Sequence, residues 1–339
     1  MLLLLSFACQ GRSLTAPLAR LRGLRMAGGR ALRPPPHMTD GDYDVAVVGG
    51  GPAGYTVAAL TAREGLSVAL IDPDPERSWP NNYGAWRTEW EALAQRLQIP
   101  ELLDCVNVNW EVTDCFFGGS FDMPFEQRTR LDRAYLQVDR GKFKECMQAL
   151  HAANDVHVLQ GSVQANTISP NLFDANLSHD ATGSSITISP SGATVKARVV
   201  VDATGFESTL VARESPTAAG FWKEQLPGYQ IAYGMTVDVS NGDISPYAGE
   251  AMTLFDYRTD HLVGTDLLED AEQRPSFVYV MPQGKSAFFE ETSLVGRDER
   301  RLEFEVCLVL TPSLKRDEFG VFACTRASNT PHRTRIRTI

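Results

Sequence analysis

The segment at residues 44–54 reads DVAVVGGGPAG. Its first five residues form a short, β-branched run that is typical of a parallel strand buried on both faces. The next six match the spacing G-x-G-x-x-G, with glycines at positions 49, 51 and 54. A glycine motif alone is weak evidence, so its meaning depends on the elements that follow it along the chain.

A helix and a second strand are predicted directly after the glycines. Proline suits the first turn of a helix, alanine and leucine dominate residues 52–64, and Gly65 closes the helix. Residues 66–71 read LSVALI, a second buried strand, which is followed by Asp72. This order is typical of a dinucleotide-binding unit: a strand, a glycine turn, a helix, a second strand and a terminal acid within about 30 residues.

Each position in this unit has a physical role. Gly49 allows a tight turn, Gly51 lets the backbone approach a pyrophosphate, and Gly54 lets the helix pack closely on the strand. The helix N-terminus offers N–H groups and the positive end of its dipole to phosphates. Asp72 would accept a hydrogen bond from a ribose hydroxyl. The predicted cofactor contacts of the unit are Gly49, Gly50, Gly51, Pro52, Ala53, Gly54 and Asp72.

A second segment favours FAD over NAD as the dinucleotide. Further strands are predicted over 156–159, 185–189 and 194–197. Residues 198–205 then read RVVVDATG, a buried strand that runs into a turn containing Asp202 and Gly205. This segment resembles the second fingerprint of FAD proteins of the glutathione-reductase and hydroxylase type, in which the turn closes over the flavin nucleotide.

An amphipathic helix is predicted between the two fingerprints, and Arg140 opens it in the sequence VDRGKFKECM at residues 138–147. Arg140 resembles the FAD-phosphate contact of the same proteins. The alternative is a solvated charge at the start of a helix.

Length and charge limit the possible classes of protein. A chain of 339 residues predicts two domains, and its net charge of −10 argues against a nucleic-acid surface. Residues 1–39 hold six arginines and no acid, which is typical of a targeting segment, and an organelle transit peptide fits better than a secretory signal. The alternative is an unstructured tail. No apolar run is long enough for a membrane-spanning helix.

The six cysteines are widely scattered and none has a metal-ligand spacing. They predict a reduced intracellular protein without a metal site.

The segment at residues 78–86 reads SWPNNYGAW, an apolar stretch that also carries hydrogen-bonding groups. Taken alone, it could equally be a buried anchor. In its position after the first fingerprint, however, it resembles the W-P-N-N-Y-G-x-W motif of plant and algal lycopene β- and ε-cyclases and their capsanthin- and neoxanthin-synthase relatives. Four later stretches resemble motifs of that family in the same order: GYQIAYG at 228–234, MTLFDYR at 252–258, FVYVMP at 277–282 and FFEETSLV at 288–295.

The resemblance covers residues from about 42 to about 305 and implies an activity. The resemblance implies that the protein, like lycopene cyclases of that family, closes the ends of lycopene into β-ionone rings in the plastid. These enzymes are isomerases (intramolecular lyases) of carotenoid biosynthesis. They use FAD in its reduced form, with NADPH as reductant, and associate peripherally with membranes. The alternatives are an ε-cyclase, a relative that converts epoxy-carotenoids, a flavin monooxygenase or prenyl reductase, and a truncated product without activity.

Two adjacent glutamates are the predicted catalytic residues. The stretches at 277–281 and 286–295 read as a hairpin, and neighbouring residues on a strand point to opposite faces. Glu290 therefore shares a face with Phe288, and Glu291 lies on the other, so only one can aim into a given cavity. A carboxyl group among apolar side chains has a raised pKa and can hold the proton that a polyene end requires. In the family, the first glutamate of this motif is tied to acid–base catalysis, which implies Glu290. The alternative for the pair is a solvated strand edge.

The predicted fold is α/β, with an FAD-binding Rossmann-like domain and a second, mostly antiparallel β substrate domain. We assign residues 40–85 and 130–215 to the first domain, and 86–129 and 216–305 to the second. The resemblance stops near Glu305, and residues 306–339 form an atypical, basic tail in place of the family's C-terminal region. An incomplete gene model or an alternative end would explain this, and such a chain is expected to bind FAD poorly.

Overall fold

The computed structural model describes residues 42–163, 177–180, 183–205, 208, 210, 230, 232–239, 244–264, 267–273, 275–294 and 320–322. The predicted targeting segment at 1–39 and most of the 306–339 tail lie outside these residues. Two compact units make up the chain. The first runs to Trp79 and resumes at Arg140, and the second comprises Pro80–Asp139 and the strands that follow the first unit.

A six-stranded sheet forms the centre of the first unit, in the order β8-β2-β1-β11-β10-β9. The strands are β1 (Asp42–Val48), β2 (Val68–Asp72), β8 (His157–Gln160), β9 (Leu177–Asp180), β10 (Gly183–Ile188) and β11 (Ala193–Asp202). β8, β2, β1 and β11 pair in parallel, whereas β10 pairs antiparallel with β11 and β9 pairs antiparallel with β10. The strands predicted from 194–197 and from 198 onward are one continuous strand, β11, and β2 begins later than predicted and includes Asp72.

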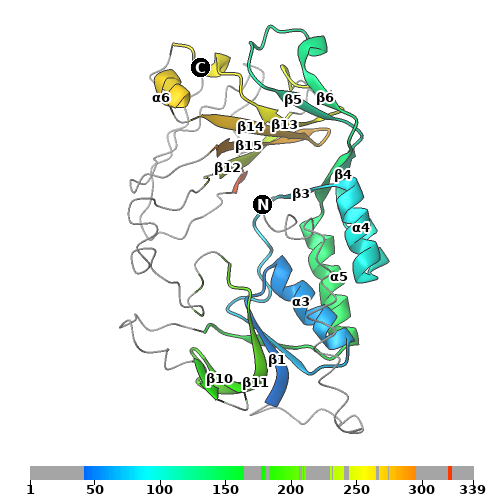
Figure 1. Cartoon of the computed structure of the whole chain (residues 1–339), viewed down its shortest axis with the longest axis vertical. Helices are drawn as coiled ribbons and strands as arrows, with labels where there is room; N and C mark the ends of the chain where they lie inside the picture. Colours follow the sequence, from blue (N-terminus) through cyan, green and yellow to red (C-terminus); the bar gives the residue numbers. More distant parts are fainter. Residues whose placement is uncertain are drawn as a thin grey trace, which may run out of the picture. The chain divides into compact units, whose positions relative to one another are not determined.

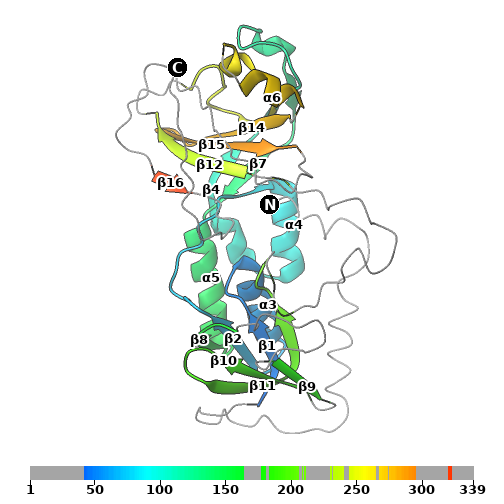
Figure 2. The ribbon, with the colours of Figure 1, turned by 90° about the vertical axis from the view of Figure 1, so that its left-hand side faces the viewer.

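Two helices of the first unit lie side by side: α3 (Pro52–Arg63) and α5 (Arg140–Ala153) (Figures 1 and 2). Tyr55 on α3 packs against His151 on α5, with ring centroids 4.9 Å apart. Small and β-branched residues of β1 and β2, such as Ala46 and Ile71, are fully buried in one core cluster with Ile186. The apolar residues that predicted two buried strands and a helix here are therefore the residues that the structure buries.

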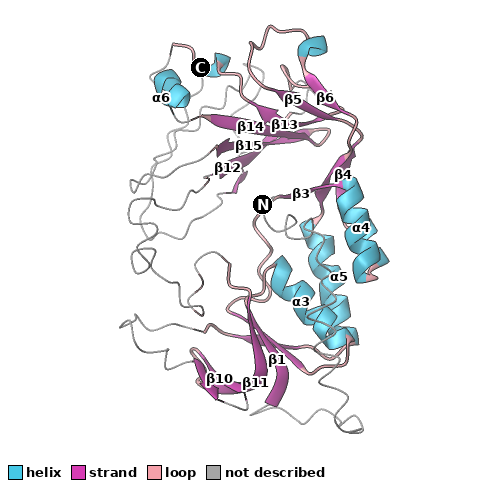
Figure 3. Cartoon of the chain, in the orientation of Figure 1, coloured by secondary structure: helices cyan, strands magenta, loops and turns pink. Residues whose placement is uncertain are grey.

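A seven-stranded sheet dominates the second unit, in the order β16-β12-β15-β14-β13-β5-β6 (Figure 3). The strands are β5 (Thr113–Phe116), β6 (Thr129–Leu131), β12 (Ala232–Asp238), β13 (Met252–Asp256), β14 (Ser276–Pro282), β15 (Ser286–Ser293) and β16 (Gly320–Phe322). All neighbours are antiparallel except β13 and β5. The sheet is therefore mostly antiparallel, as predicted, and its edge strand β16 comes from the tail.

A three-stranded sheet, β3-β7-β4, belongs to the same unit. Its strands are β3 (Tyr83–Trp86), β4 (Val106–Trp110) and β7 (Tyr135–Val138). The other helices among the described residues are α4 (Arg87–Leu97), α6 (Leu267–Gln273) and the 3₁₀ turns η1 (Pro100–Asp104), η2 (Phe125–Gln127) and η3 (Asp260–Leu262).

The unit boundaries differ from those assigned from the sequence. Residues 80–85 and 130–139, which we assigned to the nucleotide domain, belong to the second unit. The reason is strand pairing, because β3 and β4 both pair with β7 and all three therefore stay together. The second half of the segment at 78–86 is accordingly a strand, β3.

Candidate functional site

The glycine turn between β1 and α3 has the geometry that a phosphate cradle needs. Gly49 has φ +108°, and a Cβ atom there would lie 2.4 Å from the carbonyl oxygen of Ala203. A Cβ atom on Gly54 would lie 1.9 Å from the carbonyl oxygen of Gly49, so helix and turn pack too closely for any other residue. A Cβ atom on Gly51 would meet nothing within 4 Å, which leaves an open face at the helix start.

The first turn of α3 also fits an anionic group. Gly51 is the N-cap, Pro52 and Ala53 are the first helical residues, and neither a side-chain cap nor an acid is present in that turn. The N–H groups at a helix N-terminus attract phosphate when no side chain occupies them. Together with the open face of Gly51, this donor set fits the pyrophosphate of a dinucleotide.

The two fingerprints meet at the carboxyl ends of β1 and β11. Val48 pairs with Asp202, and the backbone N–H of Ala203 donates to the carbonyl oxygen of Val48 at 2.8 Å. The Asp202 carboxylate accepts hydrogen bonds from the N–H (3.0 Å) and hydroxyl (2.7 Å) of Thr204 and from Ser208. These bonds hold the turn that ends at Gly205, which has φ +92°. The fold thus places both predicted nucleotide segments side by side.

Asp72 ends β2 beside the glycine turn and is only 8% exposed. One carboxylate oxygen accepts the N–H of Gly50 at 2.6 Å, and the other accepts the N–H of Asp74 at 2.8 Å. Each oxygen retains a further lone pair. Its role as acceptor of a ribose hydroxyl stays a prediction, and the structure adds that Asp72 holds the Gly50 backbone.

Arg140 is the first residue of α5. One turn later, Phe143 packs edge-on against Trp79, with ring centroids 5.4 Å apart. The indole of Trp79 in turn donates to the carbonyl oxygen of Gly50 at 2.8 Å. The start of α5 therefore lies beside the glycine turn, and the phosphate contact proposed for Arg140 stays a prediction.

The segment at 78–86 serves both units. Trp79 is 6% exposed and is a buried anchor of the glycine turn. Asn82 belongs to the second unit, where Gln137 donates to its side-chain oxygen at 2.7 Å and its side-chain amide lies 3.1 Å from the sulfur of Met281. Gly84 lies against Tyr135, because a Cβ atom at position 84 would come within 2.5 Å of that ring.

Glu290 occupies the middle of β15, opposite Gly234 on β12 and Tyr279 on β14. Phe288 lies on the same face of the strand and belongs to a buried cluster. We call this side of the sheet the aromatic face; its ring-bearing residues are Trp86, Trp110, Tyr135, Phe255, Tyr279 and Phe288. Phe277 continues it, with centroids 5.1 Å from both Phe255 and Tyr279.

The electrostatics of this face favour the protonated acid. Burial raises the pKa of the Glu290 carboxyl, and the hydroxyl of Thr292, which donates to it at 3.4 Å, opposes the rise. Burial also raises the pKa of the Tyr135 and Tyr279 phenols, and the Glu290 charge adds to both shifts. A carboxyl group and two phenols that all favour their neutral forms therefore lie close together.

Glycine at position 234 gives the Glu290 carboxyl its space. A Cβ atom on Gly234 would lie 2.4 Å from the ring of Phe288 and 3.4 Å from a carboxylate oxygen of Glu290. Any side chain there would displace the ring, which is the neighbour of the acid on this face.

Glu291 lies on the opposite side of β15, as the alternation predicted. The hydroxyl of Ser276 donates to its carboxylate at 2.7 Å, and burial raises its pKa while this bond opposes the rise. We call this side the aliphatic face; its buried residues are Met235, Val237, Val239, Ile244, Val280, Ala287 and Phe289. The two glutamates predicted as catalytic thus occupy different environments.

A buried ion pair underlies the aliphatic face. Arg258 donates to Asp256 through two nitrogens, each at 2.9 Å, and both side chains are 1% exposed. The guanidinium lies 3.7 Å from the ring centre of Phe116 and 5.6 Å from that of Tyr247, which packs on Phe289. The stretch at 252–258 contains the pair, but its pairing could not be read from the sequence.

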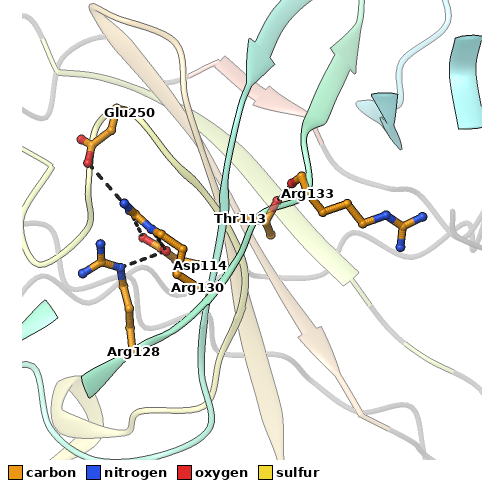
Figure 4. A network of polar contacts seen from close by, with 6 residues as sticks. All are labelled: Thr113, Asp114, Arg128, Arg130, Arg133 and Glu250. Atoms are coloured by element: carbon orange, nitrogen blue, oxygen red, sulfur yellow. Dashed lines mark hydrogen bonds and ion pairs between the residues drawn. The ribbon is translucent and has the colours of Figure 1, made fainter. Parts of the chain in front are cut away.

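A second ionic network holds the edge of the large sheet. Asp114 on β5 is 1% exposed and accepts hydrogen bonds from Arg128 at 2.9 Å and Arg130 at 2.7 Å (Figure 4). The carboxylate of Glu250, at the outer side of Arg130, lies 3.8 Å from the Arg130 guanidinium. The cluster joins β5, β6 and the residues before β13, and its charges balance, so we assign it a structural role.

Sequence reasoning missed Tyr279 and Tyr135 as neighbours of Glu290. A signal existed for Tyr279, because the tight turn at Gly284-Lys285 sets the register of the hairpin and pairs residues 279 and 290. Tyr135 lies near enough to Glu290 for their charges to interact, and it comes from β7, in a different sheet, which no local pattern indicates.

Within the described ranges, no group of histidine, cysteine, aspartate or glutamate side chains is arranged to hold a metal ion. The helices seen there are all too short or too polar to cross a membrane.

These features define a class: an α/β protein with a glycine-rich turn at the end of a parallel strand and a second, mostly antiparallel unit that carries partly buried acids. A sequence model described as lycopene cyclase protein matches residues 44–307, and the chain belongs to this family.

Named relatives agree with this assignment. The chain is 36% identical over 262 residues to the chloroplastic lycopene beta cyclases of Solanum lycopersicum and Arabidopsis thaliana, covering 77% of this chain and 45% of each relative. It is 31% identical over 265 residues to the chloroplastic neoxanthin synthase of Solanum lycopersicum, covering 77% and 46%. The chain thus spans about half the length of the curated relatives that it matches. The plastid location predicted from the sequence agrees with these chloroplastic names.

Solved structures with a partial likeness include a geranylgeranyl bacteriochlorophyll reductase-like protein from Thermoplasma acidophilum, at 17% identity and a TM-score of 0.46, covering 75% of this chain and 57% of that one. Another is the flavin-dependent brominase Bmp2, at 16% identity and a TM-score of 0.47, covering 74% and 56%.

Proposed function

We propose that this protein takes part in the flavin-dependent, non-redox cyclisation of lycopene ends to β-ionone rings, as an isomerase (intramolecular lyase) of carotenoid biosynthesis in the plastid. Membership of the lycopene cyclase family supports the reaction class. The observation that carries the proposal is the Glu290 carboxyl, which lies on the aromatic face with a raised pKa. A raised pKa favours the protonated form of the acid, which is the form that can deliver a proton to an apolar substrate.

In the proposed reaction, the Glu290 carboxyl donates its proton to the terminal alkene of the polyene. The alkene π pair forms the new C–H bond and leaves a tertiary carbocation. The π pair of a neighbouring double bond closes the six-membered ring, and the ring then loses a proton to the Glu290 carboxylate. One proton enters and one leaves, so no oxidant or reductant is consumed.

The surroundings of Glu290 suit a cationic path. The faces of aromatic rings attract cations, and Phe277 and Tyr279 supply such faces beside the acid. The apolar cluster around Phe288 excludes water that would trap the cation. Neutral phenols at Tyr135 and Tyr279 add hydrogen-bonding groups without adding charge.

FAD is the proposed cofactor. Its pyrophosphate would be held by the glycine turn and the N-terminus of α3, with Asp72 and Arg140 at the ribose and phosphate and the Asp202–Gly205 turn beside them. Reduced FAD, formed with NADPH, supplies an electron-rich ring that favours nearby positive charge. We assign Glu291 no catalytic role, because its bond to Ser276 and its position on the aliphatic face suit a structural group.

The test is expression of the chain in bacteria that accumulate lycopene, followed by pigment analysis. The proposal expects cyclic products that carry β-ionone rings and, with the purified chain, no stoichiometric oxidation of NADPH. Unchanged lycopene from a chain that binds FAD would contradict the proposal. NADPH consumption that depends on substrate would instead favour an oxidoreductase, and ε-rings or altered epoxides would favour the other relatives.

A further inference from the structure

The segment at 73–79, between β2 and the second unit, is fastened to both helices of the first unit. The hydroxyl of Tyr55 on α3 donates to the carbonyl oxygen of Pro75 at 3.1 Å. The ammonium of Lys144 on α5 donates to the carbonyl oxygens of Pro75 and Arg77 at 2.6 and 2.8 Å. Two helices therefore fix the backbone of this segment just before Trp79.

Trp79 ends the segment in a closely packed position. Its ring meets Tyr55 edge-on at 5.5 Å and Phe143 at 5.4 Å, and it is 6% exposed. Buried indole N–H groups require an acceptor. Here the acceptor is the carbonyl oxygen of Gly50, at 2.8 Å, in the middle of the glycine turn.

Side chains hold the Gly50 backbone from both sides. Its N–H donates to Asp72 at 2.6 Å, while its carbonyl accepts from Trp79. Because a trans peptide is planar, the carbonyl of Gly50 and the N–H of Gly51 point in opposite directions. Holding the carbonyl toward Trp79 therefore turns the N–H of Gly51 away from it. Glycine has little conformational preference of its own, so a turn of three glycines needs such an external constraint.

We propose that Trp79 is a positioning residue for the dinucleotide pyrophosphate: its indole N–H orients the Gly50–Gly51 peptide so that the Gly51 N–H is ready to donate to phosphate. The inference rests on the proposed FAD binding. It assigns the first tryptophan of the 78–86 segment to the nucleotide, whereas in the sequence that segment served only as a family motif. The group that the Gly51 N–H would recognise is the diphosphate of the cofactor. ADP carries the same group, so it should bind through the same contact.

The experiment compares two tryptophans in the full chain. Trp79→Phe removes the indole donor, and Trp90→Phe is the matched control, because Trp90 is 4% exposed and donates to the carbonyl oxygen of Leu102 at 2.7 Å in the second unit. FAD and ADP are titrated by fluorescence, and urea unfolding without ligand is recorded for each variant. We expect Trp79→Phe to weaken FAD and ADP binding about tenfold, as for one lost hydrogen bond to a charged group. Trp90→Phe should bind both as the wild type does, with a similar loss of stability.

A second substitution separates packing from hydrogen bonding. Trp79→3-benzothienylalanine keeps the ring size and replaces the N–H by sulfur. It should lower the affinity for FAD and for ADP to the same extent as Trp79→Phe. Unchanged FAD affinity in this variant would overturn the role of Trp79 while leaving the proposed function intact. Failure of the wild-type chain to bind FAD at all would overturn the proposed cofactor, and the inference with it.

Discussion

The two faces of β15 differ although their glutamates are adjacent in the sequence. Glu290 is surrounded by rings, with Tyr279 opposite it and Phe288 beside it. Glu291 is bonded to Ser276 on the face whose core is aliphatic and rests on the Asp256–Arg258 ion pair. Burial raises the pKa of both carboxyl groups. A raised pKa alone therefore does not identify the catalytic acid, and the side chains around each group must decide.

This comparison separates a reactive face from a structural one. The aromatic face has an acid with a raised pKa, next to a glycine that leaves room for it. On the aliphatic face, Glu291 is hydrogen-bonded to Ser276, and Asp256 is paired with Arg258. Substitutions on the first face should change the reaction, whereas those on the second should change the stability.

The largest expected effect is on catalysis by Glu290→Gln. A loss of general acid catalysis typically lowers the rate by about 10²- to 10⁴-fold, because glutamine cannot deliver a proton. The measurement is the initial rate of ring formation from lycopene, with FAD binding checked by absorbance. Glu291→Gln is the matched control and should keep most of the rate. Equal losses in both variants would remove the distinction between the faces.

The next largest effect concerns stability beneath the aliphatic face. Asp256→Asn leaves the Arg258 guanidinium, which is 1% exposed, without a counter-charge, and should cost about 3–5 kcal/mol of unfolding free energy. Urea unfolding measures the loss. The control is Glu111→Gln, which breaks an exposed ion pair to Arg87 and should shift the urea midpoint little. Comparable midpoints for the two variants would show that the buried pair contributes nothing special.

Gly234→Ala should have an intermediate effect, and it acts on the aromatic face. The added methyl group would collide with the Phe288 ring, and such overpacking typically costs about 1–3 kcal/mol. The displaced ring should also lower the rate of ring formation by moving Glu290. Gly249→Ala is the control, because a Cβ atom there meets nothing within 4 Å. Wild-type stability and rate in Gly234→Ala would contradict the close packing around the acid.

The smallest effect is a dependence of stability on pH that both faces share. Each glutamate has a folded-state pKa above the ordinary value of 4.5, so the folded protein binds protons more tightly than the unfolded chain. The resulting stabilisation is complete below pH 4.5 and is lost as the pH rises through the folded pKa, by about 1.4 kcal/mol for each unit of pKa difference. Between pH 4 and 8, the urea midpoint of the double variant Glu290→Gln/Glu291→Gln should fall less with rising pH than that of the wild type. An equal fall in both proteins would contradict the assigned pKa shifts.

Much of the first unit could be predicted because its signals are local. The glycine spacing, the strands around it and Asp72 lie within a short stretch, and the structure builds β1, α3 and β2 there. The unit boundaries were harder to predict, because β3 and β7 belong to the second unit through their pairing with each other. No local pattern in residues 80–85 or 130–139 reveals that partnership.

The sequence by itself determined that Glu290 and Glu291 face opposite ways, since side chains alternate along any strand. It also determined the glycine turn, where backbone sterics exclude other residues. Only the tertiary structure decided which glutamate lies among aromatic rings, because Tyr135 and Phe255 come from strands outside the hairpin. The physical reason is that strand alternation is a property of neighbouring residues, whereas the polarity around a carboxyl group depends on segments brought together by folding.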